Sequence, residues 1–319
     1  MPDNLPAPSS KKSAPIELPR VRTLFAGADT VAESGFLRRE IASRMHERLQ
    51  LIRIEPTRVL DAGCGEGHDL TLLQKQFAQA HVTGLDASPA MLAPLRAGQR
   101  GASSTLNRML GKWLTRNSAS DAQDVSLLCG NFAELPFGAD AIDLIWSNLA
   151  LHWHPQPDSV FAEWRRVLRV DGLLMFSCFG PDTFKQIRTA FAAVDEAPHA
   201  LAFVDMHDFG DMLINTGFST PVMDMETITV TYDTVQKLLA DVRAWGGNPL
   251  STRRRGLLSR AQGARFRQAL EAQRQPDGKL PLSFEIIYGH AFRPSPNLRR
   301  SNPYPAESVI RRRPKPAPE

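Results

Sequence analysis

The sequence contains few cysteines and no long apolar run. Its 319 residues include only Cys64, Cys129 and Cys178, which are far apart and form no C-x-x-C pair. That spacing argues against a disulfide framework or a zinc cluster. No apolar stretch approaches the roughly 18 residues of a membrane-spanning helix, and the first residues do not resemble a secretory signal. We therefore expect a cytoplasmic protein without a metal site or a membrane span.

Positive charge is concentrated in one segment. The formal net charge is +4, but residues 293–319 alone carry seven basic and two acidic side chains. Prolines are frequent both there and in the first 19 residues. Such segments bury too little apolar surface to offset their chain entropy. We expect disordered tails at 1–20 and 294–319, and we expect neither a DNA nor an RNA partner.

Strand and helix patterns alternate between the two tails. A helix is expected at 30–54, followed by strands and helices in turn; the expected strands are 58–61, 81–86, 125–129, 141–147, 173–179, 222–232 and 280–292. Strands separated by helices at this spacing predict βαβ units and a parallel, doubly wound α/β sheet. Residues 21–293 then form one domain, with a helix in an insertion at 106–114 and a helical cap inserted at about 233–279.

A glycine loop carries the strongest chemical signal. Asp61, Gly63, Gly65 and Gly67 form a D-x-G-x-G-x-G pattern between an expected strand and an expected helix, and Asp86 ends the next strand. Glycines let a ligand touch the backbone, and the helix N-terminus offers unpaired N–H groups. An acid at the end of the second strand is placed to accept ribose hydroxyls. The pattern predicts an adenosine ligand; the alternative is a flexible turn with no ligand.

This loop resembles motif I of the class I S-adenosylmethionine-dependent methyltransferases. Residues 130–137 are similar to the G-D-x-x-x-L-P-F segment of that family, with Asn131 in place of the acid but still able to accept a hydrogen bond. The resemblance implies S-adenosylmethionine as the cofactor and a mostly parallel seven-stranded sheet. It also implies cofactor contacts by Asp61, Gly63, Gly65, Gly67, Asp86, Ala87, Met91, Asn131, Phe132 and Asn148.

Further segments resemble the malonyl-acyl-carrier-protein O-methyltransferases of biotin synthesis. These are residues 148–153 (NLALHW), 165–172 (RRVLRVDG) and 179–184 (FGPDTF), with similar stretches at 203–208, 221–224 and 284–292. The resemblance implies methylation of the free carboxyl of a malonyl thioester on acyl carrier protein. Residues 25–33 lack the tyrosine usual in that family. Two alternatives therefore remain, a small-molecule or quinone-pathway methyltransferase and a methyltransferase-fold assembly factor.

The acceptor site is less well defined by sequence. His152 and Trp153 follow the fourth expected strand, where an acceptor should enter, although both are also plausible core residues. A cation should hold the malonyl carboxylate, and the sequence does not distinguish Arg188, Arg243 or the run Arg253, Arg254 and Arg255. That run lies in a segment, 243–274, with eight arginines and one acid. It is either a solvated surface or a docking face for an acidic partner, and acyl carrier protein, a phosphate-bearing substrate or RNA would each suit its charge. No catalytic base is assigned, because a malonyl carboxylate is already ionised near neutral pH.

Overall fold

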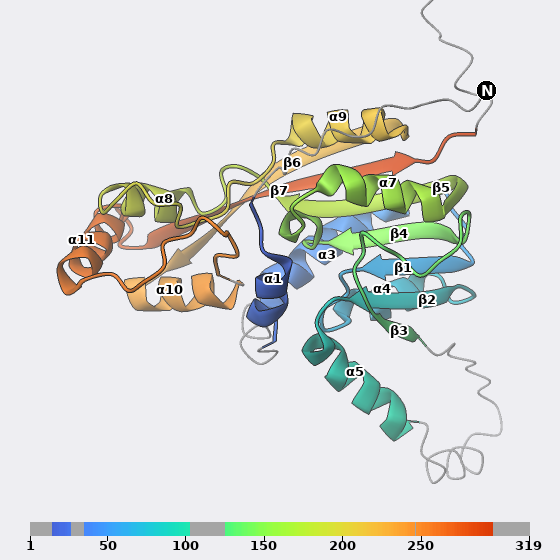
Figure 1. Cartoon of the computed structure of the whole chain (residues 1–319), viewed down its shortest axis with the longest axis horizontal. Helices are drawn as coiled ribbons and strands as arrows, with labels where there is room; N and C mark the ends of the chain where they lie inside the picture. The colour runs from blue at the N-terminus through green and yellow to red at the C-terminus, as the bar shows by residue number, and fades with distance from the viewer. Residues whose placement is uncertain (1–14, 27–34, 103–124, 246, 296–319) are drawn as a thin grey trace, which may run out of the picture.

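A seven-stranded sheet runs through the whole molecule (Figure 1). The structure is a computed structural model that describes residues 15–26, 35–102, 125–245 and 247–295. The strand order is β3-β2-β1-β4-β5-β7-β6. The strands are β1 (Arg58–Ala62), β2 (His81–Asp86), β3 (Ser126–Cys129), β4 (Ile142–Asn148), β5 (Leu168–Phe179), β6 (Ser219–Tyr232) and β7 (Leu280–Phe292).

The sheet is mostly parallel, which confirms the predicted doubly wound α/β class. Strands β1 to β5 pair in parallel, and only β7 runs antiparallel to its neighbours β5 and β6. The strand order reverses between the neighbours β1 and β4. The chain continues from β1 to β2 on one side and from β4 to β5 on the other. Ligands of such sheets bind beyond the carboxyl ends of the strands at this switch point.

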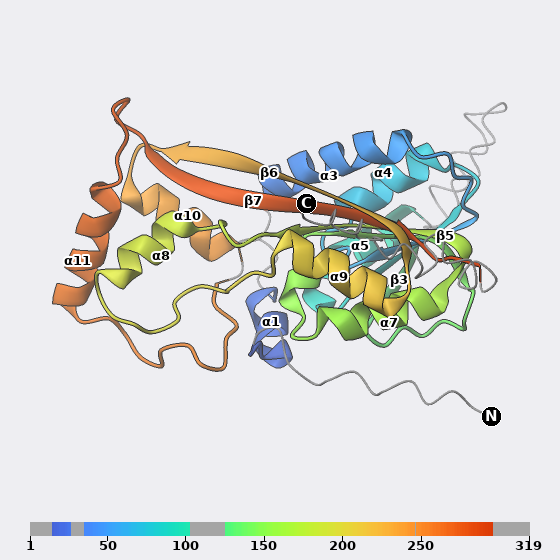
Figure 2. The ribbon, with the colours of Figure 1, turned by 90° about the horizontal axis from the view of Figure 1, so that it is seen from above.

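Helices cover both faces of the sheet (Figure 2). On one face, α3 buries Leu37, Ile41, Met45 and Leu49, the periodic residues of the helix expected at 30–54. On the other face, α7 and α9 pack together over the sheet. The described helices are α1 (Leu18–Leu24), α3 (Gly35–Gln50), α4 (His68–Gln76), α5 (Pro89–Ala102), η1 (Leu151–Trp153), α7 (Pro157–Val167), α8 (Lys185–Ala192), α9 (Met206–Thr216), α10 (Val235–Ala244) and α11 (Arg260–Glu271).

The inserted cap lies away from the switch point. Strands β6 and β7 extend beyond β5 and carry α8, α10 and α11 at their far end (Figure 1). Ser259 begins α11 with a capping box, in which its side chain and that of Gln262 exchange hydrogen bonds with the backbone. Residues of the inserted cap do not line the pocket at the glycine loop, because the long hairpin of β6 and β7 holds the cap to one side.

Some predictions fall outside the described residues, namely the helix at 106–114 and most of both tails. The expectation of disorder through residue 20 is wrong for its described part, because α1 begins at Leu18 and the buried Ile16 bridges Leu250. Among the described helices, none has both the length and the apolarity needed to cross a bilayer. In the same described ranges, no group of three histidine, cysteine or acidic side chains is arranged to hold a metal ion.

Candidate cofactor and acceptor sites

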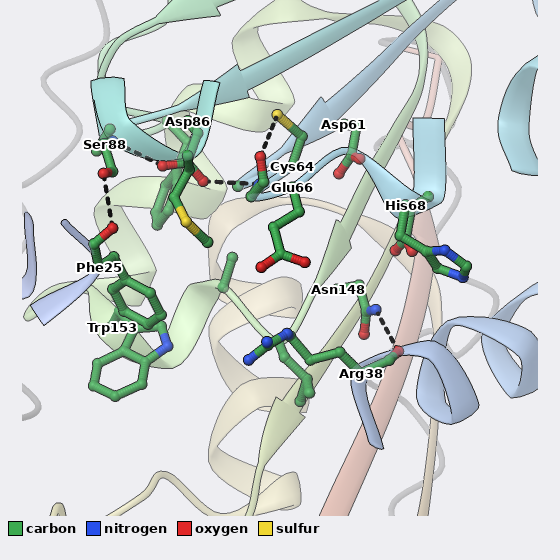
Figure 3. Close-up of a pocket in the computed structure, with 18 of the residues that line it drawn as sticks. Phe25, Arg38, Asp61, Cys64, Glu66, His68, Asp86, Ser88, Asn148 and Trp153 are labelled. Carbon is green, nitrogen blue, oxygen red and sulfur yellow. Dashed lines mark hydrogen bonds between the residues drawn. The ribbon is translucent and has the colours of Figure 1, made fainter. Parts of the chain in front are cut away.

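A pocket opens at the switch point, beyond the carboxyl ends of β1, β2 and β4 (Figure 3). The glycine loop forms one wall, and residues from α1 and the start of α3 form the opposite wall. Eight residues expected to contact the cofactor line this pocket: Asp61, Gly63, Gly65, Asp86, Ala87, Met91, Phe132 and Asn148. Chain segments far apart in sequence therefore meet where the motif predicts a ligand.

The three loop glycines have different local roles. All three have positive φ, at 89° for Gly63, 50° for Gly65 and 75° for Gly67. A Cβ on Gly63 would lie 2.3 Å from the Ala150 Cβ, and one on Gly67 would lie 2.7 Å from a Leu95 methyl. A Cβ on Gly65 would meet only the Met91 Cε, at 3.6 Å. Packing therefore requires glycine at 63 and 67, whereas Gly65 leaves space on the pocket side.

Asp86 fixes the loop and faces the same pocket. Its Oδ2 accepts a hydrogen bond from the Gly65 N–H at 2.9 Å, and its Oδ1 accepts one from the Ser88 N–H at 2.8 Å. Burial raises the pKa of Asp86, and these two hydrogen bonds partly oppose that effect. A carboxylate has about four lone-pair sites, so Asp86 keeps acceptor capacity for ligand hydroxyls.

Asp61 is a buried acid with an unsatisfied oxygen. Its side chain lines the pocket, only 1% of the residue is exposed, and its Oδ2 has no hydrogen-bond partner within the described part of the chain. Burial, together with the negative charges of Asp69 and Asp86, raises the pKa of Asp61 well above its usual value. Such a group is costly unless a donor or a cation joins it. The ammonium and sulfonium of the expected cofactor are cations, so the buried Asp61 carboxyl fits them.

Asn148 holds the pocket wall together. Its Nδ2 donates to the Arg38 carbonyl at 3.1 Å, and its Oδ1 accepts from the Ser177 hydroxyl at 2.8 Å. The end of β4 is thereby joined to α3 and β5. Nearby, the Trp146 indole donates to the buried Asp69 carboxylate at 2.9 Å.

Two expected cofactor residues lie outside the pocket lining. Gly67 is the N-cap residue of α4, in a left-handed conformation. The Asn131 side-chain oxygen accepts a hydrogen bond from the Ala133 N–H at 3.0 Å. Gly67 and Asn131 thus stabilise the conformation of the local backbone, and neither lines the pocket with the eight residues named above.

His152 is also displaced from its expected position. It is 7% exposed and absent from the pocket lining, and it packs against the rings of Phe179, Trp153 and Phe203. Both its ring nitrogens lack partners among the described residues, and burial lowers the pKa of His152 to about 3. His152 therefore does not line the cofactor pocket, and its expected contact with the acceptor stays a prediction. Trp153, in contrast, does line the pocket.

The arginines expected to hold the acceptor have structural partners instead. The Arg188 guanidinium donates to the carbonyls of Pro181 and Thr183, at the turn before α8. Arg253 pairs with Glu17 at 3.2 Å, and Arg254 pairs with Asp195 at 2.6 Å. Arg255 is exposed. None of these four arginines lines the pocket, because they belong to the displaced cap and its connections.

Sequence reasoning missed the cations that do line the pocket, Arg22, Arg38 and Arg39. Arg38 is half-buried, and its guanidinium lies over the Trp245 ring at 5.2 Å from the centroid. Figure 3 shows the side chains of Arg38 and Glu66 directed into the same pocket. Burial lowers the pKa of Arg38, and the Glu66 charge opposes this. No motif marks these residues, because α3 reaches the loop only through tertiary packing.

Helix α1 closes the pocket on one side. Phe25, directly after α1, packs edge-on against Trp153 at 5.1 Å between centroids, and its carbonyl accepts a hydrogen bond from the Ser88 hydroxyl at 3.0 Å. The segment before α1 pairs with residues 249–251. There the Glu17 N–H donates to the Pro249 carbonyl at 3.0 Å, and the Ser251 N–H donates to the Pro15 carbonyl at 2.9 Å.

Comparisons with known proteins agree with this geometry. Residues 60–176 match the methyltransferase domain family. A malonyl-acyl-carrier-protein O-methyltransferase from Laribacter hongkongensis is 44% identical, over 88% of this chain and 91% of its own length. One of the same name from Gallionella capsiferriformans is 39% identical, over 89% of this chain and 94% of its own. The structure of YcgJ from Bacillus subtilis has a TM-score of 0.52 at 17% identity, and the match covers 81% of this chain and 99% of that one.

Proposed function

The chain belongs to the malonyl-acyl-carrier-protein O-methyltransferase family, and we propose that it methylates the free carboxyl of a malonyl thioester on acyl carrier protein. The methyl ester masks one end of the acyl chain, so that fatty-acid synthesis can extend it toward the dicarboxylate precursor of biotin. The observation that carries the proposal is the pocket at the switch point, with its buried, unsatisfied Asp61 oxygen and the space beside Gly65.

Residues around this pocket have distinct tasks in holding S-adenosylmethionine. Asp86 would accept hydrogen bonds from the ribose, Asp61 would face the cationic methionine end, and Phe132 would pack against the adenine. Once bound, the cofactor supplies an electrophilic methyl group. Asn148 keeps the end of β4 in register with α3, which positions the pocket wall.

The reaction needs orientation more than proton transfer. A malonyl carboxylate is ionised at neutral pH and acts as the nucleophile without a base. The protein must hold it in line with the methyl group and exclude water. His152 is buried and does not line the cofactor pocket, so we assign it no proton transfer. Turnover should therefore be nearly flat between about pH 6.5 and 8.5.

We also propose a protein partner and a location. The exposed arginines of α11 and the loop before it, Arg255, Arg260, Arg265 and Arg267, suit an acidic partner. The family of the chain favours acyl carrier protein as that partner. The cysteines are free thiols, consistent with a reducing cytoplasm.

Labelled methyl transfer tests the proposed function. The protein is incubated with methyl-labelled S-adenosylmethionine and one of three acceptors: malonyl-carrier protein, acetyl-carrier protein, or a free phenol or quinone. We expect a base-labile methyl ester with the malonyl form alone, and rescue of a biotin auxotroph that lacks this activity. Label in the phenol or quinone, or no transfer to malonyl-carrier protein by a protein that binds the cofactor, would overturn the proposal.

A further inference from the structure

A second cavity, of about 280 Å³, lies beside the cofactor pocket in the region of the displaced cap. Its walls come from η1, the end of β5, and helices α8, α10 and α11. Most of the lining is apolar or aromatic, including Phe179, Phe191, Phe203, Leu239 and Trp245. The hairpin of β6 and β7, which holds the cap to one side, thus places the cap around a cavity of its own.

The two cavities share walls at two points. Trp153 lines both of them. Arg38 lines the cofactor pocket, and its guanidinium lies over the ring of Trp245, which lines the second cavity. A ligand that fills the second cavity and reaches past Trp153 would therefore enter the cofactor pocket, where the Arg38 guanidinium lies. A guanidinium presents five N–H donors and favours a carboxylate there.

The cavity is also lined by an exposed cation, Arg243. This residue lines the cavity from the last turn of α10, and its side chain is exposed. Two other polar lining groups are occupied: His199 pairs with Asp195 at 2.6 Å, and the Asn248 amide donates to the Pro198 carbonyl at 2.9 Å. The buried indole N–H of Trp245 has no hydrogen-bond partner among the described residues. For Arg243, no side-chain hydrogen bond or ion pair occurs among the described residues.

From this arrangement we propose that the second cavity is the acceptor site. It binds a carboxylate-ended acyl thioester, with the carboxylate at the Arg38 wall and the thioester arm leaving past Arg243. Apolar walls accommodate the acyl and thioester groups, and the two arginines give the ligand its direction. The inference deepens the proposed function and rests on it.

A cavity-filling variant tests the proposal. Leu239 is half-buried in the cavity wall, and its neighbour Ala240 is exposed on the same helix outside the lining. We expect Leu239→Trp to raise the KM for malonyl-carrier protein by roughly tenfold or more, since the bulk occupies the acceptor's space. The Kd for S-adenosylmethionine, measured by calorimetry, should not change. Ala240→Trp adds the same side chain in solvent and should match the wild type.

A charge reversal provides a second test that does not depend on repacking the cavity. We expect Arg243→Glu to raise the KM for malonyl-carrier protein several-fold. Arg53→Glu makes the same charge change on an exposed residue beyond the end of α3 and should have no effect. If Leu239→Trp does not fold, judged by circular dichroism and melting, the comparison of Arg243→Glu with Arg53→Glu tests the acceptor site.

The outcomes separate the two proposals. A wild type that methylates malonyl-carrier protein, with folded Leu239→Trp and Arg243→Glu variants that match their controls, overturns the acceptor site alone. A wild type that binds the cofactor and transfers no methyl group to malonyl-carrier protein overturns the proposed function, and the acceptor site with it.

Discussion

The Asp61 carboxyl has conflicting effects on stability and on binding. Its raised pKa means that ionisation is unfavourable in the folded protein without a ligand. Stability is therefore lost as the pH rises above the unfolded-state pKa of about 3.9. Asp61→Asn keeps the shape and removes the charge. We expect the cofactor-free variant to melt a few degrees higher at pH 8, and to bind S-adenosylmethionine about tenfold or more weakly.

Melting curves and calorimetry check these opposite shifts in one variant. The gain in melting temperature should shrink toward pH 4, because the Asp61 carboxyl of the wild type is then neutral in the folded protein, as the amide of the variant always is. Cofactor affinity equal to that of the wild type would remove Asp61 from the binding site. A fall in both melting temperature and affinity would point to a folding defect instead.

The neutral His152 ring predicts acid sensitivity. Its folded-state pKa of about 3 lies below the ordinary value, so its contribution to stability is complete above about pH 6.5 and is lost as the pH falls toward 3. His152→Phe fits the surrounding rings and has no charge to bury. We expect a smaller loss of melting temperature between pH 7 and pH 5 than in the wild type, with turnover retained. Loss of turnover in a folded variant would show that the imidazole does act in the reaction.

Individual site residues were predictable where they lie in one contiguous motif. Asp61, Gly63 and Gly65 belong to such a motif, and they line the pocket together with Asp86 from the next strand. Arg38 carries no such signal, because its place depends on how α3 packs against the sheet. His152 lies beside Trp153 in the sequence, yet a single turn of 3-10 helix buries one ring in the core and turns the other to the pocket.

At the scale of elements, α1 is a short helix that contributes Val21 and Arg22 to the pocket wall, which makes it a small lid. It buries none of its own residues, while Phe25 at its end contacts Trp153. We expect Phe25→Ala to weaken S-adenosylmethionine binding several-fold while the melting temperature barely changes. Leu24→Ala, in the same segment but outside the pocket lining, serves as the control. Equal affinities by calorimetry in both variants would show that the lid has no part in cofactor binding.

The presence of the strands was easier to predict than their exact bounds. The strand expected at 81–86 has those bounds in the structure, whereas β5 begins at Leu168, five residues before the expected start. Leu168 pairs with Ile142 across a register shift, so tertiary pairing extends the strand through polar residues. Helix α1 was not predicted, since seven residues of mixed polarity form no amphipathic pattern.

At the scale of the whole molecule, the displaced cap presents a basic surface on α11. Arg265 and Arg267 are exposed there, as Arg53 and Lys75 are elsewhere on the molecule. We expect Arg265→Ala with Arg267→Ala to slow association with malonyl-carrier protein at low salt. The difference should shrink in high salt, because the screening length falls from about 10 Å at 0.1 M to about 3 Å at 1 M. The double variant of Arg53 and Lys75 to alanine controls for net charge.

Stopped-flow or surface-based association rates measure this effect. Identical salt dependence in the two double variants would show that the carrier protein does not contact α11. The position of this surface was not predictable from the arginine-rich segment alone, because ion pairs with Glu17 and Asp195 occupy Arg253 and Arg254.

The backbone pairing of residues 15–17 with 249–251 bears on the order of the catalytic cycle. These hydrogen bonds join the segment before α1, the lid of the cofactor pocket, to the loop beside the second cavity. If the acceptor occupies the second cavity, we expect its methylated form to leave without moving α1, and S-adenosylhomocysteine to leave only when α1 moves. We therefore expect S-adenosylmethionine to bind first and S-adenosylhomocysteine to leave last. Product inhibition by S-adenosylhomocysteine should then be competitive against S-adenosylmethionine and noncompetitive against the acceptor, so that the cellular ratio of these two molecules sets the flux through the enzyme.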